Sequence, residues 1–365
     1  MKIQEISSFL ENVAPASLQE TYDNAGLITG NSAWDCTGII TCLDATEAVV
    51  LEAIDKGCNL IVAHHPIIFG GLKKITGKNY VEKTIITAIK NDIAIYAIHT
   101  NLDNILTGVN GAMADQLGLV NRKILQPKKG IIKKLETYVP IAQAENLRNA
   151  LFAAGGGNIG KYSECSFTAA GEGSFKAGTS ANPFVGKRDQ RHTENELKLE
   201  MIFPAWAENN MLTALIAAHP YEEVAYNIFT LNNIHQDIGS GLVGELPETL
   251  TATDFLQLLK KSFDLTVIRH TPLIGKPIKK IALCGGAGSF LIGAAVASGA
   301  DFYITGDIKY HEFFDANSRL VIADIGHYES EQFTINLLFN ILREKFPNFA
   351  VLKTGVHTNP VHYYV

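Results

Sequence analysis

Two adjacent histidines, His64 and His65, end an apolar run in the stretch IVAHHPIIFG (residues 61–70). Alone, such a pair is equally compatible with a strand end at which one imidazole is solvated and the other is hydrogen-bonded. Three further residues of ligand type, Asp103, His327 and Glu331, make a metal site the better interpretation. Imidazole and carboxylate together favour Zn²⁺, Fe²⁺, Mn²⁺ or Co²⁺, whereas Ca²⁺ and Mg²⁺ prefer oxygen ligands.

The spacing of these residues suggests two ions rather than one. Successive side chains of a strand point apart, so His64 and His65 are better placed to serve two neighbouring ions than to chelate one. His327 and Glu331 are four residues apart and share one face of a helical turn. Glu331 or Asp103 could bridge two cations. We therefore predict a site for two divalent metal ions per chain. The alternatives are a helix N-cap for Asp103 and a solvated helix start for His327 and Glu331.

The surrounding sequence predicts an α/β fold with a duplicated, mostly parallel core. Residues 38–69 have a strand–helix–strand pattern, and residues 279–312 repeat it. Residues 319–331 similarly match residues 93–104. The polar groups follow the predicted strands, and parallel sheets place ligand sites at the carboxyl ends of their strands.

The middle of the chain has a different pattern. Residues 127–243 read as strand, helix, two strands, helix and strand, the ferredoxin-like order. We therefore predict a core formed by residues 1–126 and 244–365, with residues 127–243 as an inserted ferredoxin-like α+β domain.

Other polar residues on the predicted rim could transfer protons or orient the substrate. We predict these catalytic or positioning roles for Asp307, His311 and His99. A strand-end histidine bonded to the backbone is the alternative for His99.

Several motifs have an unremarkable alternative. CGGAGS (residues 284–289) could seat a phosphate on backbone N–H groups, although a close-packing turn suits its incomplete pattern better. His219, Tyr221 and Glu222 could form a ligand or subunit surface, with packing as the simpler interpretation. His357 and His362 have no partner that the sequence identifies.

Composition limits the classes of function. The 365 residues carry a net charge of −6, which weighs against a general nucleic-acid binder. Residues 281–300 lack charge over a bilayer-length stretch, but their five glycines favour a strand, a turn and a helix over a membrane span. The five scattered cysteines and the absence of a signal-like N-terminus lead us to expect a cytoplasmic protein with reduced thiols.

Four motifs in this order, AHHPIIF, IHTNLDN, GADFYITGDIKYHE and DIGHYESE, resemble those of the Nif-three-like family of proteins with dinuclear metal centres. YDNAGLITG matches the opening signature of that family, many of whose members are named type 2 homologues of GTP cyclohydrolase I. HPYEEVAY resembles the PII/CutA-like insert of the longer members. The resemblance covers essentially the whole chain. It implies that His64, His65, Asp103, His327 and Glu331 are metal ligands, and that six chains form a ring as a trimer of dimers.

The resemblance leaves the activity open. A metal-dependent hydrolase of the cyclohydrolase type would add water at C8 of the purine ring of a nucleotide, open the ring and release formate. A phosphoesterase would attack phosphorus in line. The alternative is a non-enzymatic ring that holds metal or senses a metabolite, with the insert as its regulatory part. The net charge disfavours a ring that encircles DNA.

Overall fold

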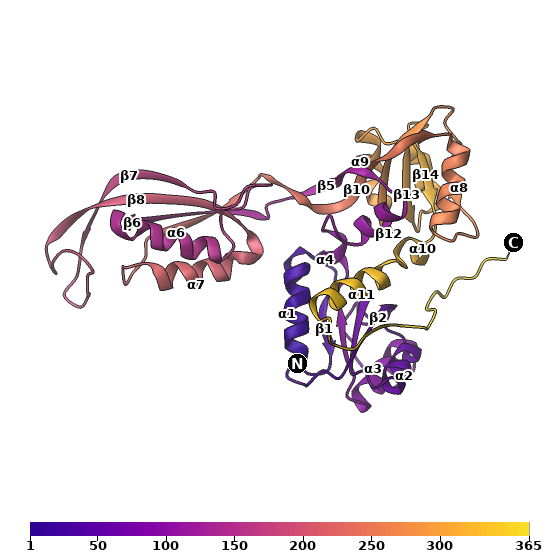
Figure 1. Cartoon of the computed structure of the whole chain (residues 1–365), viewed down its shortest axis with the longest axis horizontal. Helices are drawn as coiled ribbons and strands as arrows, with labels where there is room; N and C mark the ends of the chain where they lie inside the picture. The colour runs from indigo at the N-terminus through magenta and orange to yellow at the C-terminus, as the bar shows by residue number, and fades with distance from the viewer. Residues whose placement is uncertain (365) are drawn as a thin grey trace. The chain divides into compact units, whose positions relative to one another are not determined.

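The computed structural model describes residues 1–364, which form two compact units (Figure 1). The core unit comprises the described residues of Met1–Pro127 and Asp237–Val365, and the insert unit is Lys128–Gln236. The predicted α/β class is confirmed.

The first sheet of the core unit has five strands in the order β1-β4-β3-β2-β15. The four strands from β4 to β15 are parallel, and β1 is an antiparallel edge. β2 and β3 are almost entirely buried, as expected for a parallel sheet covered on both faces. The strands are β1 (Gly26–Thr29), β2 (Ile39–Asp44), β3 (Leu60–His65), β4 (Ala94–Ala97) and β15 (Val351–Lys353).

Helices cover both faces of this sheet. Figure 1 shows α1 and α11 along one face and α2 and α3 on the other. Local chemistry fixes where α3 begins, because the Asn79 side chain accepts a hydrogen bond from the Glu82 backbone N–H. The helices that follow or flank these strands are α1 (Ile3–Val13), η1 (Ala16–Leu18), α2 (Glu47–Asp55), α3 (Tyr80–Lys90), α4 (Thr100–Asp103), α5 (Val109–Gln116) and α11 (Thr334–Lys345).

The second sheet of the core unit has six strands in the order β11-β14-β13-β12-β10-β5. β12, β13 and β14 are parallel neighbours, as β2, β3 and β4 are in the first sheet, in agreement with the predicted duplication. The strands are β5 (Val120–Lys129), β10 (Ile234–Leu250), β11 (Arg269–His270), β12 (Ile278–Ala287), β13 (Phe302–Gly306) and β14 (Val321–Asp324). Its helices are α8 (Ala252–Ser262), η4 (Ser289–Leu291), α9 (Ile292–Ala297), η5 (Tyr310–Ala316) and α10 (His327–Glu331).

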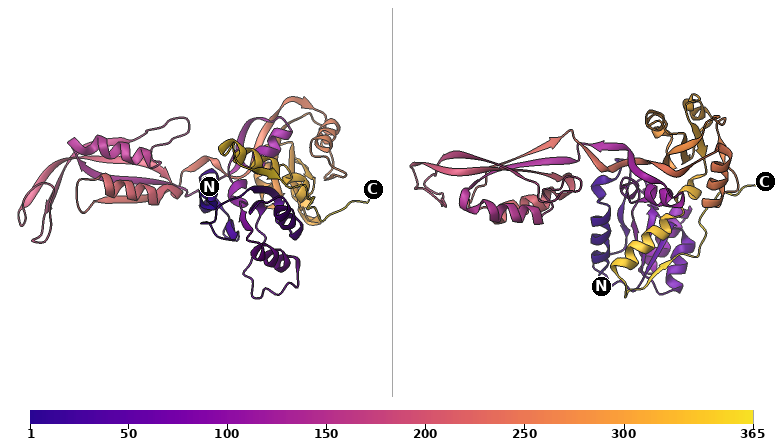
Figure 2. Two further views of the ribbon diagram at one scale, coloured as in Figure 1. Left: turned by 60° about the horizontal axis from the view of Figure 1, so that its bottom comes forward. Right: turned by 45° about the horizontal axis from the view of Figure 1, so that its top comes forward.

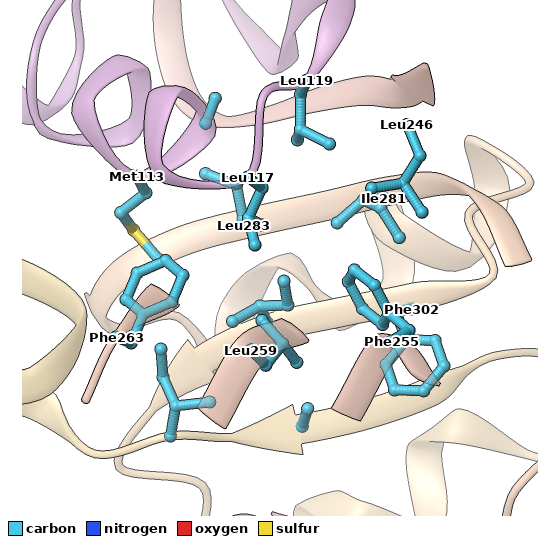
Figure 3. Packing of buried hydrophobic residues seen from close by; sticks show 14 of the residues in the cluster. Met113, Leu117, Leu119, Leu246, Phe255, Leu259, Phe263, Ile281, Leu283 and Phe302 are labelled. Atoms are coloured by element: carbon cyan, nitrogen blue, oxygen red, sulfur yellow. The ribbon is translucent and has the colours of Figure 1, made fainter. Parts of the chain in front are cut away.

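A large apolar cluster holds this sheet against α8 and α5 (Figure 3). Phe255 of α8 meets Phe302 of β13 edge-to-face, with ring centroids 4.8 Å apart, and both side chains are fully buried. Burial of one such side chain stabilises the fold by about 1.5–3 kcal/mol. This packing therefore holds β12, β13 and β14, whose ends lead to polar residues, in fixed positions within the core unit.

The uncharged stretch at residues 281–300 is a strand, a turn and a helix, as predicted. It consists of the main part of β12, the short η4 and α9. No helix in residues 1–364 is long and apolar enough to cross a membrane.

The insert unit contains a four-stranded sheet in the order β7-β8-β6-β9, the ferredoxin-like arrangement (Figure 2). Figures 1 and 2 both show α6 and α7 on the same face of this sheet, where Leu147, Leu151 and Leu215 are fully buried. The elements are β6 (Ile132–Pro140), η2 (Ile141–Gln143), α6 (Ala144–Ala153), β7 (Phe167–Lys176), β8 (Arg191–Pro204), η3 (Ala205–Ala207), α7 (Glu208–Ala218) and β9 (Tyr226–Leu231).

We predict that each unit folds without the other. β5 and β10, the strands that lead into and out of the insert unit, are neighbours in the second sheet, and Gly239 lies directly against Gln126. Replacing residues 128–236 by a short Gly/Ser linker should therefore leave a core unit that melts in one cooperative transition, measured by circular dichroism. Non-cooperative melting with several linker lengths would contradict this prediction.

Candidate metal centre

The five predicted ligands lie at the ends of parallel strands in both sheets of the core unit. His64 and His65 are the last two residues of β3, and Asp103 closes α4, which follows β4. His327 and Glu331 are the first and last residues of α10, which follows β14. The fold thus brings side chains together that are more than 260 residues apart in the chain.

Three of the histidines are held by Nδ1 and present Nε2 to a common space. His64 Nδ1 donates to the Ile98 carbonyl at 2.9 Å, and His65 Nδ1 donates to Asp44 at 2.8 Å. His327 Nδ1 donates to Asp307 at 2.7 Å. A ring held in this way by an outer partner is typical of histidine in metal sites.

Glu331 lies at the centre of this space and is only 3% exposed. Its Oε2 atom is 2.9 Å from His65 Nε2 and 3.1 Å from His327 Nε2. Its Oε1 atom faces His64 Nε2 at 3.9 Å. The two carboxylate oxygens therefore face different imidazoles, as a bridging ligand requires.

Two buried polar atoms in the cluster lack the partners that burial normally demands. His64 Nε2 and Asp103 Oδ1 are 3.6 Å apart, and neither has a hydrogen-bond partner among the described residues. Because the Ile98 carbonyl can only accept, the proton of a neutral His64 lies on Nδ1 and Nε2 is a bare acceptor. An imidazole nitrogen and a carboxyl oxygen that face one another in a buried space without a hydrogen bond are a pair of ligand atoms that fits a cation.

Charges in the cluster are strongly coupled. Burial acts to raise the pKa of Glu331, but hydrogen bonds from the surrounding histidines, that from His327 above all, outweigh it and hold the pKa well below its usual range. Burial raises the pKa of Asp103 well above its usual range, and the Glu331 charge adds to this shift. Glu331 is therefore the permanent anion of the centre.

The histidines divide into a neutral one and two cationic ones. Burial lowers the pKa of His64 to about 4. Burial would lower the pKa of His65 too, but Asp44 and Glu331 raise it to about 10. For His327 the effect of burial is likewise outweighed, and Glu331 with Asp307 raises the pKa to about 9. In the protein alone, two imidazolium groups thus provide the positive charge that Glu331 requires.

Possible ligand atoms form two overlapping groups within which they lie no more than 4.8 Å apart. One is His65, His327 and Glu331, and the other is His64, His65 and His99. Asp103 adjoins the second group through its contact with His64. A cluster of histidine and glutamate that could bind metal is therefore present.

Glycines allow α10 to approach β12 closely. Gly286 has φ +62°, and a Cβ there would lie 2.4 Å from Glu331 Oε1. Gly326, with φ +94°, leads the chain into α10. The N–H groups of Gly285 and Gly286 donate to Asn110 and Ser330, so these two are not free for a phosphate. Most of CGGAGS is the closely packed end of β12, and η4 begins at Ser289, so the predicted turn is confined to the junction at Gly288.

The three predicted rim residues lie in different settings. Asp307 binds His327 and has φ +57°, an uncommon conformation for a residue other than glycine. The ring of His99 contacts those of His64 and His65, and its Nδ1 bonds to Asp23 at 2.8 Å rather than to the backbone. His311 is exposed on η5, where its ring contacts Tyr310 and Phe314. The structure thus brings Asp307 and His99 to the cluster but not His311.

Sequence reasoning gave no role to two carboxylates that orient histidines. Asp44, the last residue of β2, binds His65, and Asp23 binds His99. Burial acts to raise the pKa of each, but the bonded histidine outweighs it, so both pKa values are lowered. Asp44 could have been found from its place at a strand end beside β3, and Asp23 from its place in YDNAGLITG.

A cavity of about 410 Å³ opens beside the cluster, a size that suits a small organic ligand. His65, His99, Asp103, His327 and Glu331 all contribute to its lining, whereas His311 is absent from the described lining. Four largely exposed aromatic side chains also line it, namely Tyr22, Phe69, Tyr80 and Phe290.

The other histidines singled out from the sequence are not among the described residues that line this cavity. In the insert unit, His219 donates to the Tyr138 carbonyl and the Tyr221 hydroxyl donates to Glu196, which is the packing expected of buried polar groups. Tyr221 and Glu222 also line a separate cavity of about 880 Å³ in that unit. His357 packs against the ring of Tyr328, and His362 is exposed.

Comparison with known proteins yields consistent matches along the chain. The family model described as Duf34/NIF3 (NGG1p interacting factor 3) matches residues 1–360. A protein of Halalkalibacterium halodurans named GTP cyclohydrolase 1 type 2 homolog is 38% identical, over 98% of this chain and 97% of its own. One of the same name from Bacillus subtilis is 38% identical, over 89% and 88%.

A solved structure matches the whole fold. The crystal structure of a Bacillus cereus protein related to NIF3 superposes with a TM-score of 0.86 at 37% sequence identity, and the match covers 100% of this chain and 99% of that one.

Replacement of Glu331 by Gln should remove most metal binding. The variant loses the charge shared by His64, His65 and His327 and leaves a buried amide among them. We expect the affinity for Zn²⁺, measured by chelator competition, to fall by more than roughly 10- to 100-fold, which is the loss typical when a residue bonded to a metal ligand is replaced. Glu344→Gln, the same change on the exposed face of α11, should bind as the wild type does. Full occupancy in Glu331→Gln would contradict this assignment.

Proposed function

The chain belongs to the Duf34/NIF3 family, and from that premise we propose that it is a metal-dependent hydrolase that acts on a nucleotide of the GTP type. The observation that carries the proposal is the pair of unpartnered buried atoms, His64 Nε2 and Asp103 Oδ1, beside the carboxylate of Glu331. In a cluster that contributed only to stability, such buried atoms would normally be hydrogen-bonded to other groups of the protein.

Two divalent ions, of Zn²⁺, Fe²⁺, Mn²⁺ or Co²⁺ type, would share Glu331. His64, Asp103 and Glu331 would hold one, and His65, His327 and Glu331 would hold the other. When bound, such ions polarise a substrate and lower the pKa of water, so that a nucleophile forms near neutral pH. The remaining steps depend on side chains of the protein.

The cavity beside the cluster supports a substrate with a planar ring. Its lining includes four largely exposed aromatic side chains on which a purine could stack, namely Tyr22, Phe69, Tyr80 and Phe290. Cavity volume and aromatic lining together favour a nucleotide-sized substrate over a polymer.

His99 is the proposed proton acceptor. Its Nδ1 donates to Asp23, whose other oxygen accepts from the Thr100 backbone N–H and hydroxyl. An imidazole oriented by a carboxylate in this way can accept a proton and stay in place as its charge changes. Asp307 is proposed to position His327 from the other side of the cluster.

A second candidate function is metabolite sensing without turnover. It is favoured by the cavity of about 880 Å³ in the insert unit, which Tyr221 and Glu222 line. Under this proposal the insert is a regulatory domain of PII/CutA type. Assembly of six chains into a ring stays a prediction under both functions.

One experiment separates the two functions. Elemental analysis of purified protein gives the metal content, and the same preparation is then assayed for release of formate from GTP and for cleavage of phosphodiesters, with each candidate metal. Hydrolysis that requires two metals per chain is the expected result. A protein that holds two metals per chain but hydrolyses neither GTP nor phosphodiesters would contradict the hydrolase function.

Two single substitutions test whether His99 is the proton acceptor. His99→Gln should retain metal while kcat falls by roughly 10²- to 10⁴-fold, the range for loss of a general base. His311→Ala should stay near the wild-type rate, because His311 contacts Tyr310 and Phe314 rather than the cluster. A slow His311→Ala enzyme with full metal would instead support the catalytic role predicted from sequence. Loss of one metal from His99→Gln would make His99 a ligand.

A further inference from the structure

The C-terminal tail, residues 354–364, passes the outer partners of the metal cluster as an extended chain after β15. In Figure 1 it is the extended yellow segment that leads to the C-terminal mark. The Thr354 backbone N–H still donates to the Thr41 carbonyl of β2, and the tail makes further contacts through its side chains. Thr354 donates to Glu52, Thr358 donates to Asp44, and Asn359 donates to Glu329.

The contact of Thr358 falls on the carboxylate that orients His65. Asp44 Oδ1 accepts from His65 Nδ1 at 2.8 Å, and Asp44 Oδ2 accepts from the Thr358 hydroxyl at 2.7 Å. With an oxygen engaged on each side, the carboxylate cannot rotate without breaking one of the two bonds. The orientation of the His65 ring therefore depends on a residue more than 290 positions further along the chain.

The tail also encloses the side of the cluster on which Asp44 lies. A second cavity, of about 510 Å³, is lined by Asp44, His65 and His327. Its wall includes residues of the tail, namely Asn359, Pro360, Val361 and Tyr363. His357 in the same segment packs on Tyr328 of α10, with ring centroids 4.9 Å apart. The tail thus contacts α10 as well as the end of β2.

We propose that Thr358 is a positioning residue for the metal centre, which acts through Asp44 to orient His65. This inference rests on the proposed metal-binding function. A bond from an outer partner to a ligand histidine fixes the ring and its tautomer, and loss of such a partner typically lowers metal affinity by roughly 10- to 100-fold. Thr358 lies one step further out, where its hydroxyl limits the rotation of Asp44.

The tail offers a matched control for the test. Thr354 and Thr358 are both half-buried, and both donate a hydroxyl to a carboxylate. The carboxylate that Thr354 contacts, Glu52, bonds to Lys56 and to the Gly355 backbone N–H rather than to a histidine of the cluster. Thr→Val keeps the shape of the side chain and removes only the hydroxyl. Thr358→Val, Thr354→Val and the conservative Thr358→Ser therefore separate the proposed role from general anchoring of the tail.

The experiment measures Zn²⁺ affinity of the full-length variants by chelator competition, with the visible absorption of bound Co²⁺ as a report on ligand geometry. Thr358→Val should lose roughly 10-fold or more in affinity and change the Co²⁺ spectrum. Thr358→Ser and Thr354→Val should match the wild type. Unchanged affinity and spectrum in Thr358→Val would overturn the inference, as would an equal loss in Thr354→Val.

A readout without metal keeps this inference distinct from the proposed function. The Nδ1 proton of His65 should give a protected NMR signal in the metal-free wild type and in Thr358→Ser, and should exchange faster in Thr358→Val. If the wild type binds no Zn²⁺, the metal function fails, and the NMR comparison still decides whether Thr358 orients His65. Equal exchange in all variants would overturn the inference.

Discussion

Burial of the Glu331 carboxylate among imidazoles is the interaction on which the centre depends. A carboxylate with 3% exposure is costly unless it is paired, since removal of an ion from water costs several kcal/mol even after the protein relaxes. His65 and His327 offset that cost with short contacts to Oε2, and both are themselves bonded to outer carboxylates. Charge therefore alternates outward from Glu331, from carboxylate to imidazole to carboxylate.

The fold can be understood as the scaffold for this arrangement. Two sets of parallel strands, β2-β3-β4 and β12-β13-β14, lead to the proposed ligands at their carboxyl ends, and α10 carries Glu331 to the histidines of β3. Close approach requires small residues where the backbone passes Glu331, which Gly286 provides. The apolar cluster under the second sheet, with Phe255 against Phe302, keeps these strand ends fixed.

Much of this organisation was predictable because buried parallel strands have continuous apolar runs and end in polar residues. The α/β class and the strand–turn–helix at residues 281–300 follow from such patterns. The ferredoxin-like order of the insert follows from its sequence of strands and helices, and the family from the resemblance of its motifs. Asp23 and Asp44 were missed, because which carboxylate bonds to a ring nitrogen depends on three-dimensional contacts. His311 follows a strand end as predicted, but η5 begins at Tyr310 and leads its ring to Tyr310 and Phe314.

Anomalous diffraction from metal-loaded crystals, recorded at the absorption edge of the bound metal, tests the central claim that Glu331 joins two ion sites. Two peaks per chain are expected, one beside Glu331, His64 and Asp103 and one beside Glu331, His65 and His327. A single peak, or peaks that do not contact Glu331, would contradict it.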